Sequence, residues 1–267
     1  MSVVKTKRNS ADYEFMSRGY TKFGGDRHLL GELRQELFLI ARELIDVPRD
    51  STWDSPDYLL NNIHKLVPRF DLNELRINII RMLNSSERFD FKQAVFMLAK
   101  CELFSLVGNE LAIQKRVNLS IQMPDDNSSI LPLHADSWSG DSFFEVVVWV
   151  PLVDCYETKS MFLVQREDYE PDKVISASAE NRKIYLKSLQ TKYKHLSVDF
   201  GELLVFDQNL PHGNVVNRES TSRWSLNCRF KSLLSPYAEK KLGEFFEPLI
   251  VRPVTKLGLE LRRLEAQ

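Results

Sequence analysis

Apolar residues recur at helical spacing in the first hundred residues of the chain. One such stripe predicts a helix that begins after an N-cap at Asp26 and ends at about Asp46, shortly before Pro48. The stripe consists of Leu29, Leu30, Leu33, Leu37, Ile40, Ala41 and Leu44. A second helical region is predicted over about 55–83, interrupted at Pro68, and a third runs from a cap at Ser85 and Ser86 to about 103. These stripes indicate core-facing surfaces rather than cofactor sites.

The pattern changes after residue 107 to short apolar runs separated by Gly, Pro, Asn and Asp. Residues 115–122 alternate, and 143–153 form a nearly continuous apolar, β-branched run. Further strands are expected at 161–164, 195–200, 203–207, 213–217 and 224–231, with a helical insertion at 178–193. Many short strands of this kind predict an α+β protein, mainly β in its core, with a jelly-roll sandwich or barrel beside a helical layer.

The two patterns predict one domain over 1–267 without a linker. Within it we expect a helical N-terminal layer at about 1–106, a jelly-roll core at about 107–235 and a C-terminal extension at 236–267. A short extended segment, 19–23, precedes the first predicted helix and ends at Gly24 and Gly25.

Composition excludes several classes of protein. Of 267 residues 43% are hydrophobic and 27% charged, and the formal net charge is -1, so no basic surface for nucleic acid is expected. No window approaches the ~20 apolar residues of a membrane span, and the polar segment 1–10 does not resemble a signal peptide. The three cysteines are far apart in the sequence and include no C-x-x-C pair, so neither a disulfide framework nor a zinc site is expected. We therefore expect a soluble, cytoplasmic protein with reduced thiols.

Common catalytic signatures are missing. The sequence has no glycine-rich dinucleotide loop, no Walker A loop, no H-E-x-x-H and no G-x-S-x-G. It therefore does not favour a dehydrogenase, a kinase, a zincin or an α/β-hydrolase.

A pattern in the β half predicts a metal site instead. His134 and Asp136 flank one residue of an extended segment, so both side chains can face the same ion while Ala135 points away. His212, between Pro211 and Gly213, can complete the site from another strand. Two imidazoles and one carboxylate on one face of an octahedral metal form the facial triad of non-haem iron(II) oxygenases. The remaining positions can bind a bidentate 2-oxo acid and dioxygen.

Further motifs resemble a known family. The pattern Gly201-Glu202-x-x-x-Phe206, then Pro211-His212-Gly213, Asn217 and Arg223-x-Ser225, is similar to the C-terminal signature of phytanoyl-CoA-dioxygenase-like enzymes, which depend on iron(II) and 2-oxoglutarate. Residues 117–122, Asp154-Cys155 and Ser160-Met161 resemble, more narrowly, oxygenases found sporadically in bacterial carbohydrate-biosynthesis clusters. The resemblance covers most of the chain and is dense from about 116 to 230.

The resemblance implies a double-stranded β-helix and assigns several roles. His134, Asp136 and His212 would be the Fe(II) ligands, and Arg223 would hold the distal carboxylate of 2-oxoglutarate, with Ser225 as a second donor. Trp149 would lie beside this cosubstrate. The implied reaction uses dioxygen, converts 2-oxoglutarate to succinate and CO2, and hydroxylates a small molecule. A carbohydrate or sugar-derived substrate is indicated only by the likeness to the cluster enzymes.

One departure and several alternatives qualify this assignment. The Pro-Gly-Ser-His turn usual in the phytanoyl group is replaced by residues 165–169, which does not favour an acyl-CoA substrate. Arg229 lies an even step from Arg223 and could clamp the cosubstrate or bind substrate instead. Asn118, Gln122 and Trp138 are candidate substrate contacts, but hydrogen bonds within the core explain them equally well.

Two other functions stay open at this stage. The chain could be a non-catalytic jelly-roll module that binds carbohydrate, with structural His and Asp residues. It could also be a cupin-like sugar isomerase that uses the same metal ligands without 2-oxoglutarate. The Arg223-x-Ser225 motif favours neither, because neither function needs a buried carboxylate clamp.

Overall fold

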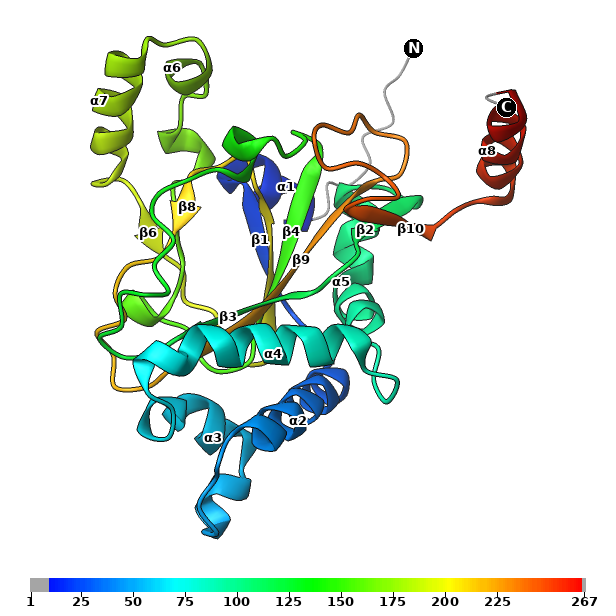
Figure 1. The fold of residues 1–267 in the computed structure, drawn as a ribbon. Helices are drawn as coiled ribbons and strands as arrows, with labels where there is room; N and C mark the ends of the chain where they lie inside the picture. Colours follow the sequence, from blue (N-terminus) through cyan, green and yellow to red (C-terminus); the bar gives the residue numbers. More distant parts are fainter. Residues whose placement is uncertain (1–9, 266–267) are drawn as a thin grey trace.

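Two antiparallel sheets form the centre of the molecule (Figure 1). The computed structural model describes residues 10–265. The larger, seven-stranded sheet has the order β1-β7-β4-β9-β2-β10, and β3 pairs with the other part of β9. Its strands are β1 (Tyr20–Gly24), β2 (Leu111–Gln114), β3 (Asn118–Gln122), β4 (Glu145–Pro151), β7 (Glu202–Asp207), β9 (Arg223–Ser232) and β10 (Phe246–Ile250). The smaller sheet, β6-β5-β8, contains β5 (Phe162–Leu163), β6 (Lys194–His195) and β8 (His212–Gly213).

One predicted strand is shorter than expected, and the strand before it was not predicted. Of the alternating run 115–122 only β3, which begins at Asn118, is a strand, whereas β2 ends at Gln114 before that run begins, and the two strands pair with successive parts of β9. Side chains replace the interrupted main-chain ladder: Gln114 Nε2 donates to the Arg116 carbonyl, and its Oε1 accepts from Arg229 N. Lys115 and Arg116, between the two strands, are consecutive polar residues that are not buried, so the apolar-in alternation begins only with Val117.

The helical layer packs on the larger sheet as the stripes predict. It comprises α2 (Arg27–Leu44), α3 (Pro56–Asn62), α4 (Leu72–Ser85) and α5 (Phe91–Leu106). Asp26 caps α2 as expected, because its carboxylate accepts hydrogen bonds from His28 N and Leu29 N. The cap of α5 differs from the prediction: Asp90, not Ser85 or Ser86, accepts from Gln93 N. Buried residues of these helices share one hydrophobic cluster with the strands.

Three segments add to this frame. The helix α1 (Ser10–Arg18) was not anticipated. The predicted insertion contains α7 (Ala179–Leu189), and the unpredicted short helix α6 (Asp172–Ile175) precedes it, both beyond the smaller sheet (Figure 1). In the C-terminal extension, β10 joins the edge of the larger sheet beside β2, and α8 (Pro253–Glu265) projects beyond it. Between residues 10 and 265 no helix combines the length and apolar character needed to cross a membrane. The prediction about residues 1–10 falls almost wholly outside the described residues, and the single-domain division stays a prediction.

Asn84 ties the helical layer to the strand that leads into the site. Its Nδ2 donates to the carbonyls of Ile80 and Val117, at 2.8 and 2.9 Å, and its Oδ1 accepts from Val117 N at 2.8 Å. The side chain thus satisfies both main-chain groups of fully buried Val117 just before β3.

We expect Asn84→Ala to lower the free energy of unfolding by about 1–3 kcal/mol, because two buried polar groups lose their partners. Asn78→Ala, on the same helix, removes only a contact with Arg81 and should change stability by less than about 0.5 kcal/mol. Urea unfolding followed by circular dichroism measures both. Equal effects of the two substitutions would contradict this role of Asn84.

Candidate metal centre

A main-chain bridge brings two histidines opposite each other. His134 N donates to the His212 carbonyl at 2.9 Å, and His212 N donates to the His134 carbonyl at 2.7 Å. Gly213 permits this approach: a Cβ at this position would lie 2.6 Å from the Leu131 carbonyl oxygen and 3.0 Å from that of Pro132. The glycine of the Pro-His-Gly motif is therefore required by the close passage of 131–134 beside β8.

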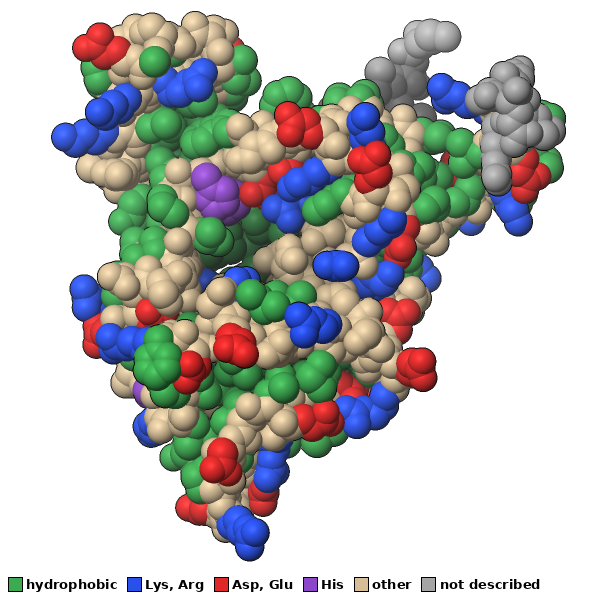
Figure 2. Space-filling view, in the orientation of Figure 1, with side chains coloured by type: hydrophobic (Ala, Val, Ile, Leu, Met, Phe, Trp, Pro, Cys, Tyr) green, Lys and Arg blue, Asp and Glu red, His purple; other side chains and the backbone are tan. Residues whose placement is uncertain are grey.

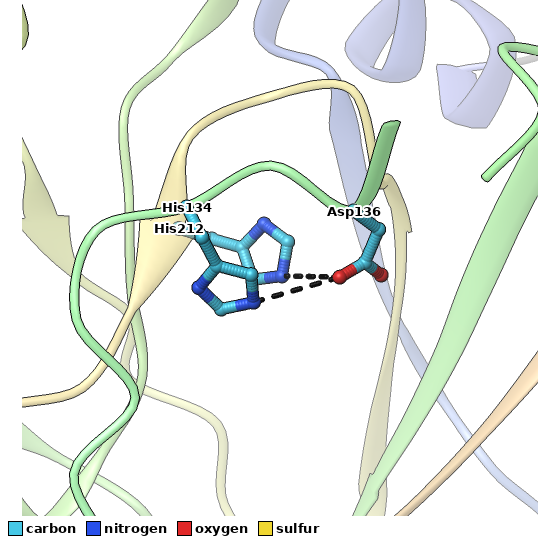
Figure 3. Close-up of side chains that lie close together, drawn as sticks. All are labelled: His134, Asp136 and His212. Carbon is cyan, nitrogen blue, oxygen red and sulfur yellow. Dashed lines mark ion pairs between the residues drawn. The ribbon is translucent and has the colours of Figure 1, made fainter. Parts of the chain in front are cut away.

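The two imidazoles present the same nitrogen to the site. His134 Nδ1 lies 2.8 Å from the Pro132 carbonyl, and His212 Nδ1 lies 2.8 Å from the Leu210 carbonyl. A carbonyl can only accept, so each Nδ1 carries the proton and a neutral ring has its lone pair at Nε2. Such second contacts fix the orientation of metal-binding histidines. Figure 3 shows both rings turned toward one carboxylate.

Asp136 supplies that carboxylate. Its Oδ1 lies 3.5 Å from His134 Nε2 and 3.8 Å from His212 Nε2. The extended backbone of buried Ala135 places His134 and Asp136 on one side, as the His-x-Asp spacing predicts. One ligand atom from each of His134, Asp136 and His212 lies within 4.8 Å of the others. The arrangement suits a divalent ion that accepts imidazole and carboxylate ligands.

Arg229 holds the other oxygen of Asp136. Its Nη2 donates to Asp136 Oδ2 at 2.6 Å, while its Nε lies 3.2 Å from Gln208 Oε1. Asp136 Oδ1 therefore faces the two histidines, and the carboxylate is oriented to bind a metal ion through this one oxygen. Arg229 therefore orients a predicted metal ligand, a contact that the sequence did not reveal.

Burial and these contacts set the charges of the site. Burial opposes ionisation of Asp136, but the hydrogen bond with His134 and the charge of Arg229 hold the pKa of its carboxyl well below the usual range. Burial lowers the pKa of His212 to about 4, so this imidazole is neutral at pH 7. Burial also disfavours the charged form of His134, but hydrogen bonds to Asp136 and to the Pro132 carbonyl raise its pKa above the ordinary value.

A cavity of about 110 Å³ joins the three residues to Arg223. The guanidinium is buried, and its Nη2 donates to Ser120 Oγ at 2.9 Å. Within residues 10–265 its Nε and Nη1 have no hydrogen-bond partner, and neither has the fully buried hydroxyl of Ser225. No carboxylate among the described residues lies within 4.0 Å of Arg223. Burial lowers the pKa of this guanidinium.

The other predicted site residues are divided between the cavity and the core. Trp149 is buried and lines the cavity, opposite Asn227 in the register of β4 and β9. Asn118 lies farther out, in a groove continuous with the cavity. Gln122 is fully buried and bonded to the Val215 carbonyl, and Trp138 packs against the core, so neither lines these spaces. Their substrate roles stay predictions.

Sequence reasoning missed Asn214, which secures the segment before His134. Its Oδ1 accepts from Leu131 N at 2.6 Å and its Nδ2 donates to the Ser129 carbonyl at 3.1 Å. Asn214 follows Pro-His-Gly directly, and that position was the only available signal. Asn227 was missed too, although it alternates with Arg223, Ser225 and Arg229 on one face of β9.

We expect His212→Ala to weaken binding of Co(II) or Ni(II) by more than roughly 100-fold, because it removes one of three ligands. His28→Ala is the matched control, since the His28 side chain is 86% exposed on α2 and should not affect affinity. Calorimetric titration measures both. Unchanged affinity in folded His212→Ala protein would disprove the assignment.

Gly213→Ala should also weaken metal binding, by roughly 10–100-fold, because the new Cβ must displace the segment that carries His134. Gly31→Ala, in the middle of α2, has open space around its Cβ and should leave metal affinity unchanged while slightly stabilising the helix. Wild-type affinity in Gly213→Ala protein would show that the close approach does not control the site.

The sequence matches no protein-family model and no curated protein at a significant level. The fold, however, is similar to solved structures. HygX from Streptomyces hygroscopicus, with nickel and 2-oxoglutarate bound, superposes with a TM-score of 0.53 at 14% identity, over 89% of this chain and 91% of that one. EctD from S. alaskensis, with bound Fe, gives 0.51 at 13% identity over 96% and 85% of the two chains. AviO1 from Streptomyces viridochromogenes Tue57 gives 0.50 at 16% identity over 88% and 100%. The predicted double-stranded β-helix with a helical layer is thereby confirmed.

Proposed function

We propose that this chain is an Fe(II)- and 2-oxoglutarate-dependent dioxygenase that hydroxylates a small molecule. One observation carries the proposal: the cavity that contains the His134, Asp136 and His212 cluster also contains a buried arginine without a counter-charge. A buried cation whose N–H groups lack partners is costly unless an anion binds there. A ligand that reaches both features needs a metal-chelating end and a distal carboxylate, and 2-oxoglutarate has both.

Arg223 and Ser225 would hold the distal carboxylate. The unpartnered Nε and Nη1 each share an edge of the guanidinium with Nη2, one of whose hydrogens is donated to Ser120, so the edge with the remaining Nη2 hydrogen would present two N–H groups to the carboxylate. The Ser225 hydroxyl, two residues along β9 and on the same face, supplies a further donor. The prediction that Arg223 is the main clamp is favoured over Arg229, which is already paired with Asp136.

The three-residue cluster would hold the iron. His134 and His212 contribute Nε2 and Asp136 contributes Oδ1, which leaves up to three positions of an octahedral ion for 2-oxoglutarate and dioxygen. When bound, iron and 2-oxoglutarate supply the oxidising chemistry: dioxygen and 2-oxoglutarate give succinate and CO2, and one oxygen atom enters a substrate C–H bond. Arg229 balances the charge of Asp136 and keeps its Oδ1 toward the metal.

Apolar side chains protect this chemistry from water. Val147, Trp149, Met161 and Phe206 line the cavity and are at least nine-tenths buried. Trp149 would pack against the carbon chain of the cosubstrate, as its predicted role requires. Exclusion of water strengthens the charged contacts at Arg223 and limits side reactions.

Three further considerations support the proposal. The fold is that of HygX, whose structure holds nickel and 2-oxoglutarate, and of EctD, whose structure holds Fe. A carbohydrate-binding module or a sugar isomerase with the same ligands would leave the Arg223 charge unexplained. The sequence resemblance supports a sugar-derived substrate and a role in carbohydrate biosynthesis, and the three free cysteines are in keeping with a cytoplasmic location.

Anaerobic titration with Fe(II) and 2-oxoglutarate should give the weak visible charge-transfer band of the chelate, and oxygen should then yield succinate. Arg223→Ala should raise the 2-oxoglutarate concentration required by roughly 10–100-fold, because a charge-assisted clamp is lost. Arg218→Ala, an exposed arginine paired with Asp125, is the control and should change neither signal.

Absence of both the band and succinate in folded wild-type protein would rule out the proposed function. A raised requirement in Arg229→Ala protein, with none in Arg223→Ala protein, would transfer the clamp to Arg229.

A further inference from the structure

A groove leads from the metal centre to the surface above α4. Its lining shares Ser120, Leu131, His134, Asn227 and Arg229 with the cavity, so the two spaces are continuous. The outer part runs between α4 and residues 128–131. Figure 2 shows that this face of the molecule is hollowed, with a histidine and both basic and acidic side chains on the borders of the hollow.

Neutral hydrogen-bonding side chains form the largest group in the lining of the groove. They are Asn73, Asn118, Ser120, Ser128, Ser129 and Asn227. Of the apolar residues beside them, Leu72, Leu119 and Ile121 are at least 98% buried, whereas Ile130 and the 55% exposed Leu131 add apolar surface. Among the described residues no Phe, Trp or Tyr side chain lines the groove. Amides and hydroxyls both donate and accept, which suits a ligand rich in hydroxyl groups.

The charged side chains that line the groove are all positive. Arg76 and Arg229 line it, and no carboxylate does. Arg229 is already paired with Asp136 and bonded to Gln208 and Gln114. Arg76 differs, because among the described residues its guanidinium donates a hydrogen bond to Asn73 Oδ1 alone, at 2.7 Å, and no acidic group among them lies within 4.0 Å of it.

We propose that the groove binds a hydroxyl-rich substrate with an anionic group, a carboxylate or a phosphate, that pairs with Arg76. This proposal rests on the proposed function, because it requires oxidation at the metal centre. The neutral, hydroxylated part of the substrate would reach that centre past Asn118 and Asn227. Arg76 holds the anion at the outer end, and Asn73 orients its guanidinium. The carbon to be oxidised therefore lies at the opposite end of the substrate from the anionic group.

The same helix offers a close control. Arg81 pairs with Asn78 three residues earlier, as Arg76 pairs with Asn73, but Arg81 does not line the groove. Replacing Arg81 with Gln therefore removes the same charge from the same helix without changing the groove. General electrostatic attraction would treat the two arginines alike.

Binding to the full chain can be measured by ligand-observed nuclear magnetic resonance with three probes: glucuronate, glucose 1-phosphate and methyl glucoside. We expect at least one anionic probe to bind about tenfold or more tightly than the neutral glucoside, since a charge-assisted contact is added. Arg76→Gln should abolish that preference, and Arg81→Gln should keep it. The ratio between the two anionic probes then distinguishes a carboxylate from a phosphate.

Equal affinity for the neutral and anionic probes would overturn the proposal, and so would equal effects of the two substitutions. No saturable binding of either anion at millimolar concentration would do the same. The proposed function is tested separately by the iron–2-oxoglutarate band of the wild-type protein. Arg76-dependent anion binding without that band would refute the proposed oxygenase function but support the proposed substrate groove. The band without Arg76-dependent anion binding would refute only the proposal about the groove.

Discussion

The main-chain bridge between His134 and His212 is the constraint on which the site depends. It joins a long irregular segment to β8, and it sets two imidazoles opposite each other before any metal is considered. Gly213 makes the approach possible, and Asn214 secures the neighbouring backbone with its side chain. Each ring is then fixed by a carbonyl two residues earlier. Local hydrogen bonds thus preorganise the ligands, which lowers the reorganisation required for metal binding.

The charges of the site differ in whether they are paired within the protein. Asp136 and Arg229 neutralise each other within the protein, so the carboxylate needs no metal to be tolerated when buried. Arg223 has no such partner, although it is buried in the same cavity. The protein therefore has an unbalanced positive charge where the proposed cosubstrate would bring a negative one. A bound anion would therefore stabilise the protein at Arg223.

The sequence was informative where chemistry depends on short spacing. His134 and Asp136 are two residues apart, and Arg223 alternates with Ser225 on one strand, so local periodicity placed each pair correctly. The strand β2 and the late start of β3 were not predicted, because Gln114 and Asn84 satisfy the main chain there through contacts with residues distant in sequence. The α5 cap was misplaced because Ser85, Ser86 and Asp90 are all good N-caps, and tertiary packing decides among them. Arg76 lay in an ordinary helical pattern, and only the fold shows that it faces the groove.

The most direct test of this account is a crystal structure of the protein grown with Ni(II) and 2-oxoglutarate, with anomalous diffraction to locate the metal. The account predicts a metal peak bonded to Nε2 of His134 and His212 and to Oδ1 of Asp136, with the distal carboxylate of 2-oxoglutarate against Arg223 and Ser225. A metal bound elsewhere, or a carboxylate that leaves Arg223 without a partner, would contradict it.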